Sequence, residues 1–265
     1  MSDDYDLDAG PDPATTAAAA PEPPDPSAPI HAVGVGPGDP AFLVPRAARA
    51  VRTAEVVVGF DTVVDVVDER ESVGGVADGV VDGTTTELLR CGYRDEAETL
   101  STFADRVADG AAGTAVLMGD PNHSGYQFLG KVEAAVDRPV RVVPGVSSLQ
   151  VAAGRARTPM EATTFVTLHR SGSVEADLAR LRADVGERHL LVLPRPFDWI
   201  PGDVAAHLLE TDGPPSLTAL VMERLTHETE RITRTTLGEL ATEAGGTGEG
   251  STQFSDLSVL AVRAD

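Results

Sequence analysis

The chain has 265 residues, and 42% of them are hydrophobic, which is enough to bury one large core or two moderate ones. Its formal net charge is −21, so we expect neither a nucleic acid nor an anionic membrane surface as a partner. The single cysteine, Cys91, excludes an internal disulfide and favours a reducing, cytoplasmic compartment. No uncharged apolar run reaches the roughly 18 residues of a membrane helix, and the acidic N-terminus does not read as a secretory signal.

The acidic residues number 42 against 21 basic ones, and Lys131 is the one lysine among the basic residues. An acid-rich, lysine-poor surface suits a high-salt cytoplasm, because salt screens the repulsion between like charges. A compositional bias without meaning for partners is the alternative. We favour the halophilic interpretation.

Residues 1–29 combine low hydrophobicity, high charge and repeated proline, which predicts a disordered acidic tail. From Ile30 onward, strand-like and helix-like segments alternate. The expected strands are 30–36, 56–59, 114–118 and 140–143, and the expected helices are 44–54, 93–108, 126–136 and 147–153. This alternation is typical of a mostly parallel α/β sheet, and we assign residues 30–156 to an N-terminal α/β domain.

The pattern changes after residue 157. Strands are expected over 163–168, 190–193, 217–222, 230–235 and 257–262, with helices over 174–183 and 201–209 and a short one over 237–242. Several strands in succession favour a mixed or antiparallel sheet. We therefore assign residues 157–265 to a C-terminal α/β domain.

Three loops in the first half each follow a predicted strand: Gly34–Asp39, Gly119–Gly125 and Pro144–Ser148. The carboxyl ends of parallel strands share one sheet edge, where ligands bind in such folds. The first loop approaches a dinucleotide-binding fingerprint, but Asp39 stands where the last glycine belongs, and Pro37 removes an amide that a pyrophosphate would need. A nicotinamide-dependent oxidoreductase is therefore the least favoured hypothesis.

The loop motifs resemble those of the tetrapyrrole methylases, which use S-adenosylmethionine in cobalamin and sirohaem synthesis. Gly34-Val35-Gly36-Pro37-Gly38 is similar to the family's G-x-G-P-G loop, and Gly119-Asp120-Pro121 to its G-D-P turn. Pro144-Gly145-Val146-Ser147-Ser148 is similar to its P-G-x-[ST]-[SA] segment, and Glu223-Arg224-Leu225-Thr226 to a stretch before a C-terminal β-hairpin. The resemblance covers residues 30–265.

The resemblance implies a two-domain fold with a mostly parallel N-terminal sheet, a mixed C-terminal sheet and S-adenosylmethionine bound in the trough between the domains. The cofactor-binding residues that it implies are Pro37, Met118, Gly119, Asp120, His123, Ser147, Ser148, Leu193 and Leu225.

Each of these residues also has a simpler interpretation. Asp120 before a proline can be ordinary turn chemistry, and Ser147 can be only a helix cap. His123 can be merely exposed in its loop. Met118 and Leu193 can be wall residues whose packing matters more than their identity.

The implied reaction is methyl transfer to a carbon of a corrinoid, and positioning carries most of its catalysis. Asp61, after the second strand, matches a position where some relatives have an acidic residue, and it is the candidate general base. His169 and Arg170 follow a strand of the second domain and are candidate substrate-binding residues, since a guanidinium pairs with a carboxylate in a bidentate way. A surface arginine is the alternative. We expect no metal site, because any cobalt belongs to the substrate.

Within the family, the resemblance is greatest to the cobalt-precorrin-7 (C5)-methyltransferases. It rests on Ser147-Ser148-Leu149-Gln150, on the strand from Phe165 to His169, and on the ending from Phe254 to Val259. One departure is Asn122-His123-Ser124-Gly125, where relatives have a bulkier segment. A homodimer, and a partner enzyme that methylates carbon 15 and decarboxylates, are implied by the resemblance alone.

Two other functions stay open. One is a methylase of the same fold with another target, either a different corrinoid carbon or a protein side chain, as in diphthamide synthesis. The other is a non-catalytic scaffold of a biosynthetic complex, against which the intact loops argue.

Overall fold

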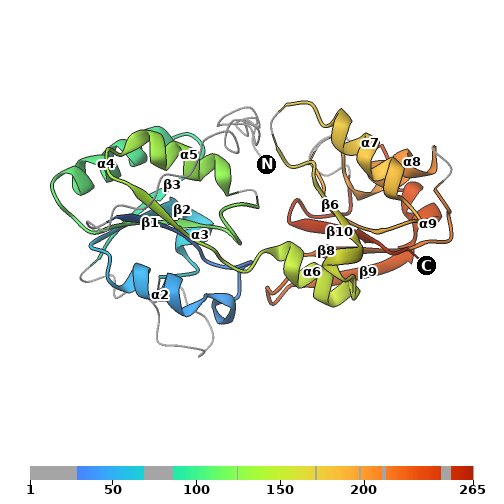
Figure 1. The fold of residues 1–265 in the computed structure, drawn as a ribbon, viewed down its shortest axis with the longest axis horizontal. Helices are drawn as coiled ribbons and strands as arrows, with labels where there is room; N and C mark the ends of the chain where they lie inside the picture. The colour runs from blue at the N-terminus through green and yellow to red at the C-terminus, as the bar shows by residue number, and fades with distance from the viewer. Residues whose placement is uncertain are drawn as a thin grey trace. The chain divides into compact units, whose positions relative to one another are not determined.

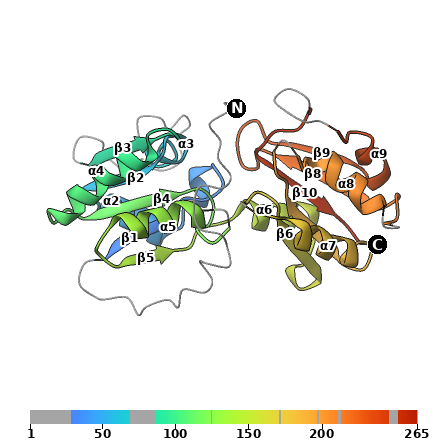
Figure 2. The ribbon, with the colours of Figure 1, turned by 90° about the horizontal axis from the view of Figure 1, so that it is seen from above.

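The computed structural model describes residues 29–68, 86–123, 125–170, 172–196, 198–210, 213–245 and 252–264, which divide into two compact units between Ser147 and Ser148. Figures 1 and 2 show both units from two sides. Residues 1–28 of the predicted tail lie outside the described residues. Among the described residues, no helix has both the length and the apolar composition to cross a bilayer.

The first unit is built on a fully parallel sheet, which confirms the predicted α/β class. Its strands are β1 (Ile30–Gly34), β2 (Val56–Phe60), β3 (Glu87–Cys91), β4 (Gly113–Leu117) and β5 (Val140–Val143), in the order β3-β2-β4-β1-β5. The sequence analysis did not predict β3, because Glu87 and Arg90 interrupt its apolar run.

Helices cover both faces of this sheet. On one face lie α2 (Pro45–Arg52) and α3 (Asp61–Val64), which follows β2, and on the other lie α4 (Glu96–Ala108) and α5 (Tyr126–Ala135). The strands are buried on both faces, so Val57 faces the α2 side while Val56 and Val58 face the α4 side. A short 3-10 turn, η1 (Pro40–Phe42), precedes α2.

The strand order creates a switch point at the carboxyl edge of this sheet. The chain leaves β1 toward α2 on one face, and it leaves the neighbouring β4 toward α5 on the other. A crevice opens where adjacent connections diverge in this way, and ligands of open α/β sheets bind there. The loops after β1 and β4 are the first two loops that the sequence singled out.

The second unit has a mixed sheet, as predicted. Its strands are β6 (Thr163–Thr167), β7 (His189–Leu193), β8 (Thr218–Glu223), β9 (Arg231–Thr236) and β10 (Ser258–Val262), in the order β6-β7-β10-β8-β9. Only the β6–β7 pair among these is parallel. Because β7 and β8 are both antiparallel to β10, the carboxyl ends of β6, β7 and β8 lie at the same sheet edge.

Helices α7 (Glu175–Asp184), α8 (Pro201–Leu209) and α9 (Leu237–Ala241) pack on one face of this sheet, and α6 (Ser148–Ala156) packs on the other (Figure 1). A 3-10 turn, η2 (Met160–Ala162), leads into β6. The expected domain boundary at residues 156/157 assigned α6 to the first domain. The compact units divide before α6 instead, because its apolar face, including Leu149 and Ala152, packs with Leu191 and Met222.

Candidate functional site

Three glycines pack against one another where β1, β4 and β5 end. A Cβ atom on Gly34 would lie 2.4 Å from the Gly119 carbonyl oxygen, and one on Gly145 would lie 2.2 Å from the same oxygen. Both distances are far inside van der Waals contact, so no side chain fits at either position. The three predicted loops therefore meet at one edge of the sheet, as expected from their places after parallel strands.

Backbone hydrogen bonds join the first two loops. The Gly36 N–H donates to the Gly119 carbonyl with an N···O distance of 3.2 Å, and the Gly119 N–H donates back to the Gly36 carbonyl at 2.8 Å. Gly36 has φ +90° and Gly119 has φ +64°, a region that favours glycine. The glycines of this motif thus provide both close approach and the left-handed backbone that the loops need.

Asp120 connects the second loop to the third. Its buried carboxylate accepts from the Asn122 N–H at 2.8 Å, which is the turn chemistry that the sequence left open. The other oxygen, Oδ2, accepts from the Gly145 N–H at 3.0 Å, across 25 residues of sequence. Asp120 is therefore both a turn residue and a bridge between two of the three loops.

The other candidates of this unit lie around these loops. Pro37 and Ser147 are buried, Ser148 is half-buried, and Met118 packs against the core on the α2 side. The His123 Nδ1 atom lies 4.0 Å from the Asp120 carboxylate, and the ring is half-buried rather than fully exposed. Met118 therefore fits the interpretation of a wall residue, and His123 lies beside the bridging carboxylate.

Asp61 lies at the same sheet edge, exposed, as the first residue of α3. Its carbonyl oxygen accepts from Arg90 Nη1 at 3.3 Å, and the Arg90 guanidinium also pairs with Asp65 and with the buried Asp68, at 2.7 Å from the latter. Arg90, at the end of β3, thus fixes the segment that carries Asp61. The sequence analysis missed this residue because it missed β3.

The candidates of the second unit gather at the shared carboxyl edge of β6, β7 and β8. Leu193 ends β7, and Leu225 is buried just after β8. The Arg170 guanidinium is already bound to α7, with Nε 3.2 Å from an Asp177 oxygen and Nη2 2.8 Å from the Ser173 carbonyl. Burial lowers the pKa of the neighbouring His169, so its ring is neutral at pH 7.

A buried hydroxyl at this edge was not singled out from the sequence. Thr167, the last residue of β6, pairs in register with Leu193. Within the described residues, its Oγ1 atom is buried and has no hydrogen-bond partner. Buried polar atoms are almost always bonded, so an unsatisfied one beside two candidate residues is a candidate ligand contact.

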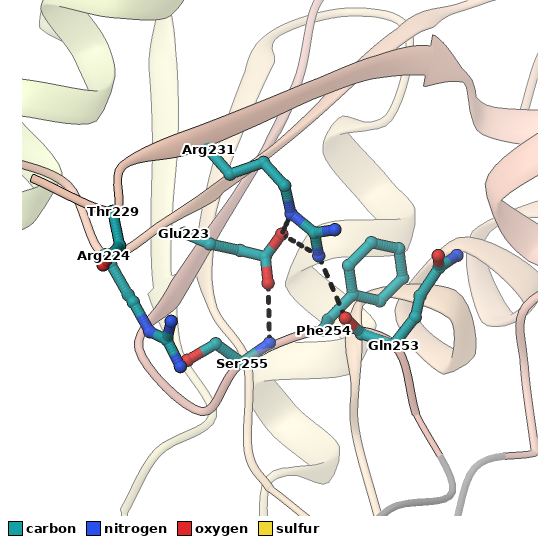
Figure 3. A pocket seen from close by; sticks show the side chains of 7 residues that line it. All are labelled: Glu223, Arg224, Thr229, Arg231, Gln253, Phe254 and Ser255. Carbon is teal, nitrogen blue, oxygen red and sulfur yellow. Dashed lines mark hydrogen bonds and ion pairs between the residues drawn. The ribbon is translucent and has the colours of Figure 1, made fainter.

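A pocket of about 490 Å³ lies at the same edge, beyond the end of β8 (Figure 3). The buried Glu223 carboxylate accepts from Arg231 Nε at 2.7 Å and from the Ser255 N–H at 2.8 Å. This network anchors the segment before β10 to the end of β8. In the parts of the chain that the structure describes, no group of three or more His, Cys, Asp or Glu side chains is arranged to hold a metal ion.

Comparison with known proteins gives a consistent result. The sequence pattern of the tetrapyrrole (corrin/porphyrin) methylases matches residues 29–241. A curated relative, the probable cobalt-precorrin-7 C(5)-methyltransferase of Methanocaldococcus jannaschii, is 26% identical over 215 residues, which are 80% of this chain and 91% of that protein.

Solved structures share the fold. Precorrin-6Y methylase from Archaeoglobus fulgidus is 21% identical, with a TM-score of 0.58 over 90% of this chain and 100% of that one. Uroporphyrin-III C-methyl transferase from Thermus thermophilus, complexed with S-adenyl homocysteine, is 24% identical, with a TM-score of 0.60 over 89% and 92% of the two chains.

Proposed function

The chain belongs to the tetrapyrrole (corrin/porphyrin) methylases, and on that premise we propose that it is an S-adenosylmethionine-dependent C-methyltransferase of corrin ring biosynthesis. We further propose carbon 5 as the target, with cobalt-precorrin-6B converted to cobalt-precorrin-7. The target carbon is supported by the curated relative and by the motif resemblance. Binding of S-adenosylmethionine is inferred from the family.

The observation that carries the proposal is the junction of Gly34, Gly119 and Gly145 at the β1/β4 switch point. The loops there have no room for added side chains, and we propose that backbone groups beside this junction bind the ligand. A cofactor with an amine, a carboxylate and an adenine can be held by such backbone donors and acceptors without charged side chains. The residues present therefore fit the proposed cofactor.

Asp120 holds the loops in the arrangement that a ligand would meet, because its carboxylate bonds to both Asn122 and Gly145. In this proposal, Pro37, Met118, Gly119, His123, Ser147 and Ser148 contact the cofactor around Asp120. From the resemblance, Leu193 and Leu225 are proposed as further contacts, and the unsatisfied Thr167 hydroxyl is a hydrogen-bonding group on the strand next to Leu193.

The bound cofactor supplies an electrophilic methyl group on a sulfonium sulfur. The chain's contribution is to orient that group in line with an acceptor carbon and to exclude water, which are positioning effects. Asp61 is proposed to accept a proton from the methylated acceptor at its exposed carboxylate, and Arg90 fixes the backbone of that residue. His169 and Arg170 stay proposed acceptor contacts, although the Arg170 guanidinium is also bound by Asp177.

Three further assignments are proposals of the same kind, the first two from the resemblance and the third from the amino-acid composition. They are a homodimer, a partner enzyme that methylates carbon 15 and decarboxylates, and a cytoplasmic location in a high-salt cell. Sedimentation of the purified protein at high salt tests the first of them.

Calorimetric titration of S-adenosylhomocysteine in high salt tests the cofactor assignment. We expect binding by the wild-type protein and loss of binding in Asp120→Ala, because that variant removes the bonds to Asn122 and Gly145. The matched control is Asp105→Ala, which removes an exposed aspartate of α4 in the same unit. Absence of binding by a folded wild-type protein would contradict the enzyme assignment and favour a scaffold.

Transfer of labelled methyl from S-adenosylmethionine then separates the possible acceptors. We expect label in a cobalt-precorrin and none in a protein side chain. A relative named diphthine synthase has the same fold, with a TM-score of 0.53 at 19% identity, so a protein acceptor is the comparison to include. Mass spectrometry of the labelled corrinoid identifies the methylated carbon, and methylation at another carbon would contradict the assignment to carbon 5.

A further inference from the structure

The pocket beyond β8 has no role in the proposed cofactor site. Its volume of about 490 Å³ is enough to admit one polar group of a larger ligand. The residues that line it are Glu223, Arg224, Thr229, Arg231, Gln253, Phe254 and Ser255. They include two guanidinium groups but only one carboxylate.

That carboxylate is already neutralised. Glu223 is 4% exposed, and its two oxygens accept from Arg231 and from the Ser255 N–H. Arg231 also donates from Nη2 to the Gln253 carbonyl at 3.0 Å. One arginine of the pocket is therefore consumed in holding the structure, and the pair contributes no net charge to a ligand.

Arg224 is different. It is exposed, and among the described residues no hydrogen bond or ion pair involves its side chain, which extends beside the pocket in Figure 3 without a bond to the other six residues drawn. Of the two glutamates that follow Arg224 closely in sequence, Glu228 does not line the pocket, and Glu230 is bound elsewhere, to Arg155 at 3.2 Å and to the Thr226 N–H at 2.7 Å. The pocket thus has an excess positive charge on a chain whose net charge is −21.

The backbone at Arg224 is also unusual. Its φ is +48°, in the left-handed region, which is costly for a residue with a side chain. Its N–H bonds to the Leu257 carbonyl at 2.8 Å, so neighbouring structure holds the conformation. Strained positions of this kind cluster at binding and active sites, and they persist where the surrounding structure holds them.

We propose that Arg224 binds a carboxylate of the methyl acceptor, with the Thr229 and Ser255 hydroxyls and the Gln253 amide as additional donors around it. This inference rests on the proposed function, because a corrinoid acceptor has several peripheral carboxylates. A guanidinium is suited to such a group through two parallel hydrogen bonds. The place of Arg224, at the sheet edge that also holds His169, Leu193 and Leu225, agrees with an acceptor contact.

Absorbance titration with a stable corrinoid polycarboxylate, cobyrinic acid, tests the inference in the presence of S-adenosylhomocysteine. We expect Arg224→Asn to bind cobyrinic acid about tenfold more weakly than wild type, since a charged bidentate contact is lost. Arg224→Lys keeps the charge but not the fork, so it should bind with intermediate strength. Asparagine tolerates a left-handed backbone, so the Asn variant should melt no earlier than wild type.

Two controls isolate the contact. Arg180→Asn removes an exposed arginine of α7 and changes the net charge equally, and it should leave binding unchanged. The heptamethyl ester of cobyrinic acid has no carboxylates, so Arg224→Asn should not weaken the binding of this ester.

Other results would overturn the inference. Equal binding of cobyrinic acid by wild type and Arg224→Asn would do so, as would failure of the wild-type protein to bind it while S-adenosylhomocysteine still binds. Weaker binding of S-adenosylhomocysteine alone in Arg224→Asn would assign the contact to the cofactor's own carboxylate instead. Failure of the wild-type protein to bind S-adenosylhomocysteine contradicts the proposed function itself, so the two failures are distinguishable.

Discussion

The carboxyl edges of the two sheets reach unusual backbone conformations with different residues. At the edge of the first sheet, positive φ angles occur at Gly36, Gly38 and Gly119, with values of 90°, 143° and 64°. At the edge of the second, they occur at Gly172 after β6, with a value of 78°, and at Arg224 and Thr226 after β8, with values of 48° and 72°. Glycine adopts this region without steric cost, whereas arginine and threonine do not.

The difference follows from what each edge offers a ligand. Around Gly34 and Gly145, backbone atoms of neighbouring loops fill the place where a side chain would project, so only bare backbone fits. Around Arg224, the backbone adjoins a pocket, and a side chain has both room and a use. The first edge is therefore suited to close contact with loop backbone, and the second to contact with side-chain groups.

Gly34→Ala should disrupt the packing of the loops at the first edge, and we expect it to destabilise the protein more than any other substitution considered. Its Cβ would lie 2.4 Å from the Gly119 oxygen and 2.7 Å from the Gly145 nitrogen, and both are backbone atoms that cannot move independently. We expect destabilisation of about 3 kcal/mol and loss of S-adenosylhomocysteine binding. Denaturant unfolding and calorimetry measure the two effects.

Gly154→Ala is the matched control substitution, and we expect it to stabilise the protein rather than destabilise it. Gly154 lies in helix α6, and an added Cβ would meet no atom within 4 Å. Alanine should therefore raise the unfolding free energy by about 0.5–1 kcal/mol. A Gly34→Ala protein as stable as wild type would show that the loops separate easily, against the packed junction described above.

Glu223→Gln should destabilise the protein at the second edge, but by less than Gly34→Ala does at the first. A glutamine can accept one of the hydrogen bonds from Arg231 and Ser255, but its amide group then faces a donor. Because the Arg231 side chain is 54% exposed, solvent screens the loss, and we expect about 2 kcal/mol of destabilisation. Glu187→Gln, at an exposed glutamate of the same unit, should stay within about 0.5 kcal/mol of wild type.

The sequence predicted the first edge better than the second for a physical reason. Parallel strands bring their carboxyl ends together, so glycines after successive strands mark a common site through their order in the chain alone. The bond between Asp120 and Gly145 could not be predicted in this way, because it depends on the registers of β4 and β5 with β1, which lies between them. The individual contacts to a cofactor stay predictions.

At the second edge, contacts between distant segments decide the geometry. The pocket exists because the Ser255 N–H reaches Glu223 across 32 residues, and no local pattern encodes that contact. The side to which helix α6 belongs was equally hidden, since an amphipathic helix that falls between two sheets in the sequence can pack on either. The left-handed backbone of Arg224 is invisible in sequence, because glycine is the residue that signals it.

Cys91 allows the first unit to be followed separately. Burial raises the pKa of its thiol from 9.0 to about 12, so the folded state keeps a proton that the unfolded state releases above pH 9. The stabilisation is fully present below pH 9 and falls as the pH rises toward 12, by about 1.4 kcal/mol at pH 10. Unfolding at pH 8 and pH 10 should show this extra loss in wild type and not in Cys91→Ala. An identical pH dependence in the two proteins would mean that the thiol is not buried.

Thr226→Gly should give the smallest change in unfolding free energy. It tests directly the contrast between glycine and other residues at positive φ angles. Threonine at φ +72° is strained, and glycine removes the strain while keeping the N–H that bonds to Glu230. Glycine also has a greater entropy in the unfolded chain, which offsets part of the strain that is relieved. We therefore expect a net gain of about 0.5–1 kcal/mol in unfolding free energy. Cobyrinic acid binding should be unchanged, because Thr226 does not line the pocket.

Arg224→Gly should also gain stability, but it should lose affinity for cobyrinic acid. The two variants therefore distinguish a strained residue whose side chain binds the ligand from a strained residue whose side chain does not. Loss of affinity in both variants would instead show that the rigidity of the loop itself, and not the guanidinium, determines binding at this edge.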